Sequence, residues 1–264
     1  MRYHQVLETL RCNDGRCVAD IHDDWMQGRT VFGGLQVALA VRAMRGMLDP
    51  GPPLRSLQAT FVAPIAGGRV ELQVDVLRRG KSVTHMQGCL LLSDGSVACT
   101  VIAIFGAARE SSFVREIPRP DLGLDPEALA DLPYIPDVAP AFLQHMQVRM
   151  ARGTPPGTGH HEPRTIIYAR VREPDCTAEE ALIALADVIP TPALSMLSKH
   201  APASSLNWTL ELLGDPAQLD VGDWSLIDTE VRAGIDGYLS QTSVLWGATG
   251  HAFSVSHQTV GIFA

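Results

Sequence analysis

Residues 56–61 read Ser-Leu-Gln-Ala-Thr-Phe and residues 205–210 read Ser-Leu-Asn-Trp-Thr-Leu, and the two hexapeptides match in type at four of six positions. A second pair of segments, Ser93–Ser96 and Ala248–His251, forms a Gly-containing turn before the last apolar strand of each half. The two offsets, 205 − 56 = 149 and 250 − 95 = 155 residues, differ only by the length of a loop. A repeat on this scale indicates two copies of one folding unit.

The first copy has the pattern of one buried helix followed by strands. Gly33-Gly34 opens Leu35–Met47, which is apolar on almost every face, as expected of a buried helix. Two short strands are expected before it, near Gln5–Arg11 and Arg16–Ile21, joined by the hairpin turn Asn13-Asp14-Gly15. Four further strand candidates follow the helix: Leu54–Val62, Arg69–Leu77, Ser82–Leu92 and Val97–Phe105.

The second copy repeats this order. Phe142–Met150 and Thr165–Val171 are strand candidates, and Thr177–Glu180 has the capping-box pattern that starts the helical run Ala181–Asp187. Pro190 and Pro192 end that run. Four strand candidates follow: Ser205–Leu213, Trp224–Arg232, Gly237–Trp246 and Ala252–Phe263.

Between the copies, Pro118–Pro140 contains six prolines, which forbid a long helix or a central strand, and we expect one short helical turn at Pro126–Leu132. We therefore predict an N-terminal unit (residues 1–112), a Pro-rich linker (113–140) and a C-terminal unit (141–264). One helix lying across an antiparallel sheet buries the apolar faces of both, so the fold class is α+β. The two sheets should join into one, because a long free edge strand invites aggregation.

The composition excludes several classes of protein. With 46% hydrophobic and 19% charged residues, the chain is a folded globular protein and not a disordered one. The chain has 21 Lys and Arg and 29 Asp and Glu, which gives a net charge of −8. An acidic chain of this kind lacks the excess of basic residues that is typical of nucleic-acid-binding proteins. No apolar run is long enough for a membrane span, and no apolar stretch of a signal peptide follows Met1. We expect a cytoplasmic protein.

Other chemical groups give weaker signals. The five cysteines are odd in number, and we expect reduced, mostly structural thiols and neither a disulfide framework nor a zinc site. His160 and His161 lack a third ligand nearby, so we expect a plain loop without a bound metal. The basic cluster Arg78-Arg79-Gly80-Lys81 is either a solvated turn between strands or a contact for a phosphorylated ligand.

Three polar residues of the second copy, Asp187, Ser205 and Gln258, are the main candidates for a functional site. Asp187 lies in an apolar run near the C-terminus of a helix, where burial and the macrodipole both disfavour a negative charge. Ser205 opens the next long strand and Gln258 lies in the last one. At the 155-residue offset Gln258 corresponds to Ala103, and Gly33–Met47 contains no acid, so only one copy carries the polar set. The alternative is a helix-end aspartate that simply reaches solvent.

Several short motifs are spread across the two halves in this order: Trp25 with Phe32-Gly33-Gly34, Ser56–Phe61, Arg78–Ser82, Ala186-Asp187, Ser205-Leu206-Asn207 and His257–Gly261. In these motifs the chain resembles the double-hotdog acyl-CoA thioesterases related to bacterial acyl-CoA thioesterase II. No Gly-x-Ser-x-Gly motif, phosphate-binding loop or dinucleotide fingerprint competes with this resemblance.

The resemblance implies a double hotdog fold, an acyl-CoA substrate and no cofactor or metal. It also implies that Asp187, Ser205 and Gln258 hold the hydrolytic water, that Arg78, Arg79 and Lys81 are candidates for the CoA phosphates, and that the chain forms a homo-oligomer, most simply a dimer. The sequence departs from the family pattern in two places. Asn207-Trp208 stands where an Asp-His pair is common, and Thr259 stands where Glu often follows the Gln.

Two other functions remain open at this point. The first is an acyl-CoA-binding hotdog protein that has lost its activity, which the retained Asp, Ser and Gln argue against. The second is a hotdog hydratase or dehydratase. That chemistry typically uses an Asp–His pair near the helix, whereas the nearest histidine downstream of Asp187 is His200.

Overall fold

Each half contains two strands, a long helix and four further strands, in a computed structural model that describes residues 1–48 and 51–264. The first half contains α1 (Tyr3–Glu8), β1 (Arg11–Asn13), β2 (Arg16–Ile21), the 3-10 helix η1 (Asp23–Trp25), β3 (Met26–Gln27), β4 (Thr30–Val31), α2 (Gly33–Arg45), β5 (Leu54–Phe61), β6 (Gly68–Arg79), β7 (Val83–Leu91) and β8 (Val97–Gly106). The remainder contains η2 (Pro126–Ala128), η3 (Ala141–His145), β9 (Met146–Arg152), β10 (Arg164–Val171), α3 (Ala178–Ala186), α4 (Ala193–Met196), β11 (Ala203–Leu212), η4 (Pro216–Gln218), β12 (Ser225–Ile235), β13 (Tyr238–Trp246) and β14 (Ala252–Ile262).

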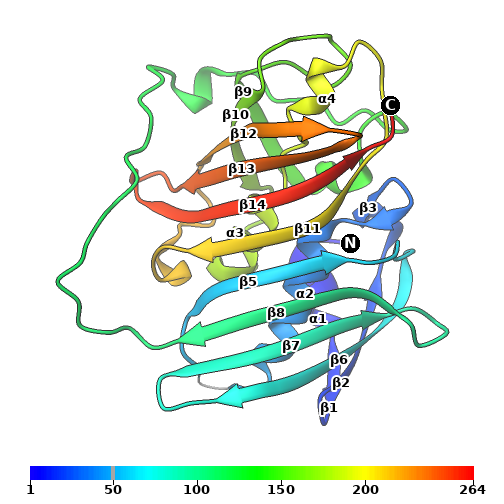
Figure 1. The fold of residues 1–264 in the computed structure, drawn as a ribbon, viewed down its shortest axis with the longest axis vertical. Coiled ribbons are helices and arrows are strands. Elements are labelled where there is room, and N and C mark those ends of the chain that lie inside the picture. Colours follow the sequence, from blue (N-terminus) through cyan, green and yellow to red (C-terminus); the bar gives the residue numbers. More distant parts are fainter. Residues whose placement is uncertain (49–50) are drawn as a thin grey trace.

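The two units share one antiparallel sheet (Figure 1). Its twelve strands lie in the order β1-β2-β6-β7-β8-β5-β11-β14-β13-β12-β10-β9. The two hexapeptides of the repeat meet at its centre, where β5 pairs with β11 and Leu210 lies opposite Leu57. The predicted α+β double hotdog with one continuous sheet is confirmed.

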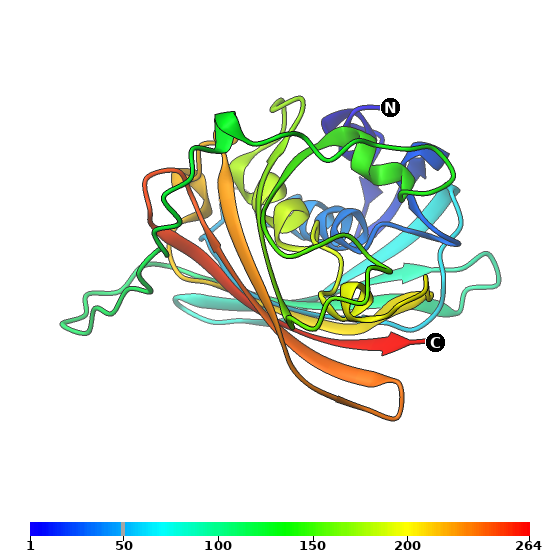
Figure 2. The same cartoon turned by 90° about the horizontal axis from the view of Figure 1, so that it is seen from above.

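The helices α2 and α3 lie together on the concave side of this sheet, which curves around them (Figure 2). α2 is buried on nearly every face, as its all-round apolar sequence predicts. Gly34 permits the close approach of α3, because a Cβ there would lie 3.2 Å from Cα of Ala184. The predicted capping box of α3 is present: the Thr177 side chain accepts the N–H of Glu180, and the Glu180 carboxylate accepts the N–H of Thr177.

Two predicted strands are wrong in whole or in part. The segment Gln5–Arg11 belongs mostly to helix α1, whose buried residues Tyr3, Val6 and Leu7 have the i, i+3, i+4 spacing of a helix face. The segment Phe142–Met150 begins as the 3-10 helix η3, and from Met146 onward it is strand β9, as predicted. Tertiary packing explains η3, because its Phe142 ring stacks on Phe32 of the first half at a centroid distance of 3.9 Å.

The Pro-rich segment runs over the outside of the sheet, and its one short helical turn is η2, within the predicted range. Its apolar side chains Ile117, Leu122 and Leu129 pack on the outer face of β10, β12 and β13. Trp246 Nε1 donates to the carbonyl of Ile117 at 3.0 Å, and Trp224 Nε1 donates to the carboxylate of Glu127 at 2.8 Å. These contacts bury part of the outer face of the second unit's strands, on the side of the sheet that faces away from the helices.

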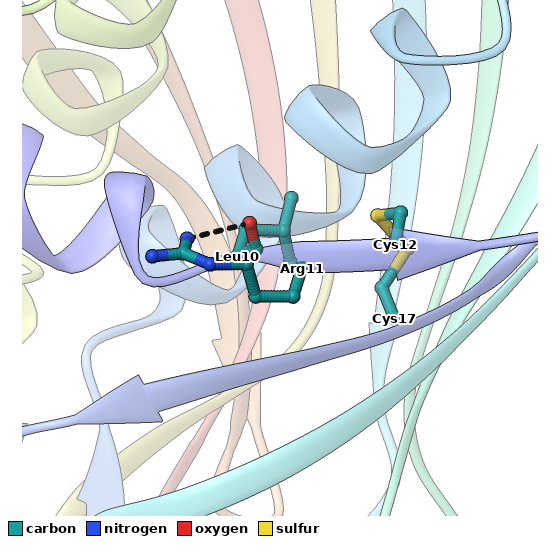
Figure 3. Close-up of a disulfide and its surroundings, with 4 residues drawn as sticks. All are labelled: Leu10, Arg11, Cys12 and Cys17. Atoms are coloured by element: carbon teal, nitrogen blue, oxygen red, sulfur yellow. Dashed lines mark hydrogen bonds between the residues drawn. A yellow bond between two sulfur atoms is a disulfide. The ribbon is translucent and has the colours of Figure 1, made fainter.

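The expectation of reduced cysteines is wrong for one pair, since Cys12 and Cys17 form a disulfide (Figure 3). The predicted turn Asn13-Asp14-Gly15 explains it, because the hairpin of β1 and β2 places the two cysteines directly opposite each other. Cys89, Cys99 and Cys176 are free thiols.

Candidate active site

Asp187 caps the C-terminus of α3 at the point where α2 begins. A Cβ at Gly33 would lie only 2.7 Å from Asp187 Oδ2 and 3.1 Å from the ring of Phe61, so glycine makes room for the carboxylate. The backbone N–H of Gly34, in the first turn of α2, donates to the same carboxylate. This N–H has no partner within its helix, and the N-terminal end of a helix favours an anion. The start of α2 therefore offsets the unfavourable C-terminal end of α3.

The side chain of Gln258 joins Asp187 from the sheet. It is buried on β14, and its Nε2 donates to Asp187 Oδ1 at 2.7 Å. The Oε1 of Gln258 accepts a hydrogen bond of 2.7 Å from Nε2 of Gln241, a buried residue of β13. The structure thus brings together two of the predicted residues and adds a third, Gln241.

Burial raises the pKa of Asp187 from its ordinary value of 3.8 to about 7. The hydrogen bonds from Gln258 and the Gly34 backbone act in the opposite direction, because they stabilise the ionised form. A carboxylate that titrates near neutral pH is suited to take a proton from water and to return it.

Ser205 lies on the same side of the sheet but outside this chain of hydrogen bonds. It is half-buried and stands opposite Val260, two residues beyond Gln258 on β14. Directly opposed residues of an antiparallel pair share a face, so Ser205 lies on the face of Gln258. The register is irregular between Ser205 and Asn207, a bulge of the kind that redirects side chains next to active sites. Among the described residues, its Oγ makes no hydrogen bond to Asp187 or Gln258.

The basic cluster is not brought to this site. Phe61, which borders the Asp187 carboxylate, pairs with Cys99 at one end of the first unit's strands, whereas Arg79 belongs to the row of Thr84 and Phe105 at the other end. The turn that joins β6 to β7 accordingly lies at the left of Figure 1, away from the end of β5. Six residues separate Phe105 from Cys99, or roughly 20 Å along the strand.

Sequence reasoning overlooked Gln241, although a signal for it existed. At the offset of 155 residues, Gln241 corresponds to Met86 (241 − 155 = 86), just as Gln258 corresponds to Ala103. The contrast between a polar residue in one copy and an apolar one in the other is the criterion that selects Gln258. Applied to every strand, the same criterion would also have selected Gln241.

Two helix-on-sheet units that share a sheet, with one polar site where their helices meet, define a double hotdog protein with a single site. The family model for the acyl-CoA thioesterase N-terminal domain matches residues 21–106, and the model for the acyl-CoA thioesterase C-terminal domain matches residues 126–262. The chain belongs to the acyl-CoA thioesterase family and is a thioester hydrolase. No curated protein matches it in sequence.

Solved structures share the fold over the whole chain. A conserved hot dog fold protein of unknown function from Alicyclobacillus acidocaldarius superimposes with a TM-score of 0.88 at 20% identity, covering 99% of this chain and 98% of that one. The tesB protein of Mycobacterium avium subspecies paratuberculosis gives 0.81 at 17% identity, and the acyl-CoA thioesterase II TesB2 of Mycobacterium marinum gives 0.77 at 16%. Both of these matches cover 99% of this chain and 98% of the other.

Within residues 1–48 and 51–264, no group of three or more His, Cys, Asp or Glu side chains is arranged to hold a metal ion. In the same residues, no helix combines the length and the hydropathy needed to cross a membrane.

Proposed function

We propose that this protein hydrolyses acyl-CoA to a free carboxylic acid and CoA, with Asp187 as the general base that activates water. The observation that carries the proposal is the carboxylate of Asp187, held between the Gly34 N–H and the Gln258 amide with its pKa raised to about 7. Membership of the acyl-CoA thioesterase family supports a thioester substrate. The Asp187 carboxylate, the Gly34 N–H and the Gln258 amide support the mechanism, because they hold a base that can exchange a proton with water near neutral pH.

In this mechanism Asp187 takes a proton from water as the water oxygen bonds to the thioester carbonyl carbon. The carbon–sulfur bond then breaks, and the CoA sulfur leaves with the proton that Asp187 returns. No covalent acyl-enzyme forms. Gln258 and Ser205 orient the water, and backbone N–H groups at the N-terminus of α2 stabilise the negative charge on the carbonyl oxygen.

The CoA phosphates need a basic contact. For Arg78, Arg79 and Lys81 to provide it, the nucleotide end of CoA has to reach the far end of the first unit's strands. Replacing the three cations with alanine should then raise KM for acyl-CoA but not for the same acyl group on N-acetylcysteamine, which lacks the phosphates. An unchanged KM for both substrates would place the phosphates elsewhere, and Lys199, exposed before β11, is the next cation to replace.

The test of the function is release of free thiol from acyl-CoAs of several chain lengths by the wild type and by Asp187→Asn. Binding without thiol release by the wild type would favour the inactive acyl-CoA-binding protein. Hydration of crotonyl-CoA in place of hydrolysis would favour the hotdog hydratase. A cytoplasmic location and a homodimer remain predictions, and the second is checked by light scattering of the purified protein.

A further inference from the structure

Gln241 is a buried polar residue with a single hydrogen-bond partner. It is 2% exposed and lies directly opposite Gln258 in the pairing of β13 with β14. Its Nε2 donates to Gln258 Oε1 at 2.7 Å, and Gln258 Nε2 in turn donates to Asp187 Oδ1 at 2.7 Å. The Oε1 of Gln241 is buried without a partner among the described residues.

The fold does not need this pair of amides. At the repeat offset, Gln241 and Gln258 correspond to Met86 and Ala103 (241 − 155 = 86 and 258 − 155 = 103). Met86 and Ala103 are also directly opposed, on β7 and β8, and both are fully buried. The same place in the other unit is thus filled by two apolar side chains. A buried amide with an unsatisfied oxygen costs stability, so packing does not account for Gln241.

We propose that Gln241 is a positioning residue that fixes the orientation of the Gln258 amide toward Asp187. This inference rests on the proposed function of Asp187. An amide group can face a carboxylate with its NH₂ or with its oxygen, and only the NH₂ attracts the ionised form. Because Gln241 donates to Gln258 Oε1, that oxygen is held on the β13 side and the NH₂ is left for Asp187. Gln241 itself touches neither the carboxylate nor the reacting atoms.

The test is a double-mutant cycle on steady-state acyl-CoA hydrolysis, with thermal melts of the same samples. Gln241→Met introduces the side chain that the first unit carries at the equivalent place, and it should lower kcat by about tenfold with little change in KM. In a Gln258→Ala background the same change should have no further effect, because the group that Gln241 orients is gone. The matched control is Thr242→Val, the next residue on β13, which faces the other side of the sheet and should keep full activity.

Full activity of Gln241→Met would overturn the inference, and so would an equal loss in both backgrounds, since Gln241 would then act by another route. If Gln241→Met fails to fold, Gln241→Leu enters the same cycle with the same expectations. The proposed function fails separately, through a wild type that does not hydrolyse acyl-CoA or an Asp187→Asn variant that keeps full activity. If those two behave as proposed while Gln241→Met remains fully active, only the role of Gln241 is refuted.

Discussion

Replacing Asp187 with asparagine should abolish most of the activity while making the protein more stable. Asparagine keeps the shape of the side chain but cannot take a proton from water. The share of catalysis that a general base supplies is about 10² to 10⁴-fold, so kcat should fall by that factor. A merely structural aspartate would behave differently, because its replacement would lower stability and activity together.

The stability gain follows from the raised pKa of Asp187. In the unfolded chain this carboxyl ionises near its ordinary pKa of 3.8, whereas in the folded protein it ionises at about 7. Well below pH 3.8 the carboxyl is protonated in both the folded and the unfolded state, so it does not change the free energy of unfolding. Between pH 4 and 7 the unfolded state loses its proton first, so the free energy of unfolding falls, and above pH 7 the full cost remains. At 1.36 kcal/mol per pKa unit, that cost is at most about 4 kcal/mol.

Asparagine removes this cost but turns its NH₂ group toward one of the two donors of the site, the N–H of Gly34 or the amide of Gln258, which returns about 1 kcal/mol or more. The net gain of about 1–3 kcal/mol should raise the Tm of Asp187→Asn by roughly 2–10 °C at pH 8. At pH 4 the buried carboxyl costs much less, so the same substitution should lower the Tm slightly. The assay is thiol release from several acyl-CoAs, with thermal melts at both pH values. Full activity of Asp187→Asn on the best substrate refutes the mechanism, and a Tm gain that is equal at pH 4 and pH 8 refutes the buried charge.

Three further predictions follow from the same structure. In the wild type, kcat/KM should fall tenfold per pH unit below an apparent pKa near 7, because protonated Asp187 cannot act as a base; a pH–rate profile that stays flat down to pH 5 would contradict this. Gly33→Ala should lower kcat by at least about tenfold, because its methyl group would displace the Asp187 carboxylate. The control is Gly46→Ala at the other end of α2, which should keep nearly wild-type activity because its methyl group would lie 3.4 Å from the carbonyl oxygen of Ala43. Cys12→Ser should lower Tm by roughly 4–8 °C, since the six-residue loop closed by the disulfide is worth about 2 kcal/mol, and a reductant should lower the Tm of the wild type but not of the variant.

The sequence predicts those parts of the fold that local patterns encode. The strands of the central sheet are found because their side chains alternate, and the junction of the two units is found because the hexapeptides at 56–61 and 205–210 repeat. Helix α1 is not predicted because only six residues form it, and over so short a segment the helical spacing of Tyr3, Val6 and Leu7 cannot be told from an apolar strand. The 3-10 helix η3 depends on the ring of Phe32, a contact more than a hundred residues away in the chain.

In the candidate site, too, local sequence patterns reveal which residues matter but not how they are arranged. Asp187 and Gln258 can be found from the sequence because each is polar where the other copy or the surrounding run is apolar. That their side chains are hydrogen-bonded depends on how α3 crosses β14, which no local pattern contains. The bulge at Ser205 likewise arises from pairing with β14. The distance of the basic turn from the site is a matter of strand register, and it becomes visible only when the rows across β5, β8, β7 and β6 are traced.

The arrangement of the two helices explains why a duplicated fold carries one site. α2 and α3 pack side by side so that the end of α3 meets the start of α2, and the end of α2 meets the start of α3. At the first meeting point stand Asp187 and Gly33. At the second, Arg45 pairs with Glu179 at 2.9 Å and Arg42 pairs with Glu180 at 2.7 Å.

By the pseudo-symmetry of the repeat, those ion pairs occupy the place where a second site would lie. These ion pairs also stabilise both helix ends. The two arginines lie at the C-terminus of α2, where a positive charge is favourable, and the two glutamates lie at the N-terminus of α3, where a negative charge is favourable. The remaining site takes a donor from each unit, the Gly34 N–H from the first and the Gln258 amide from the second. Neither unit alone could hold the Asp187 carboxylate in this way, so the single site depends on the junction between the two copies and not on either copy by itself.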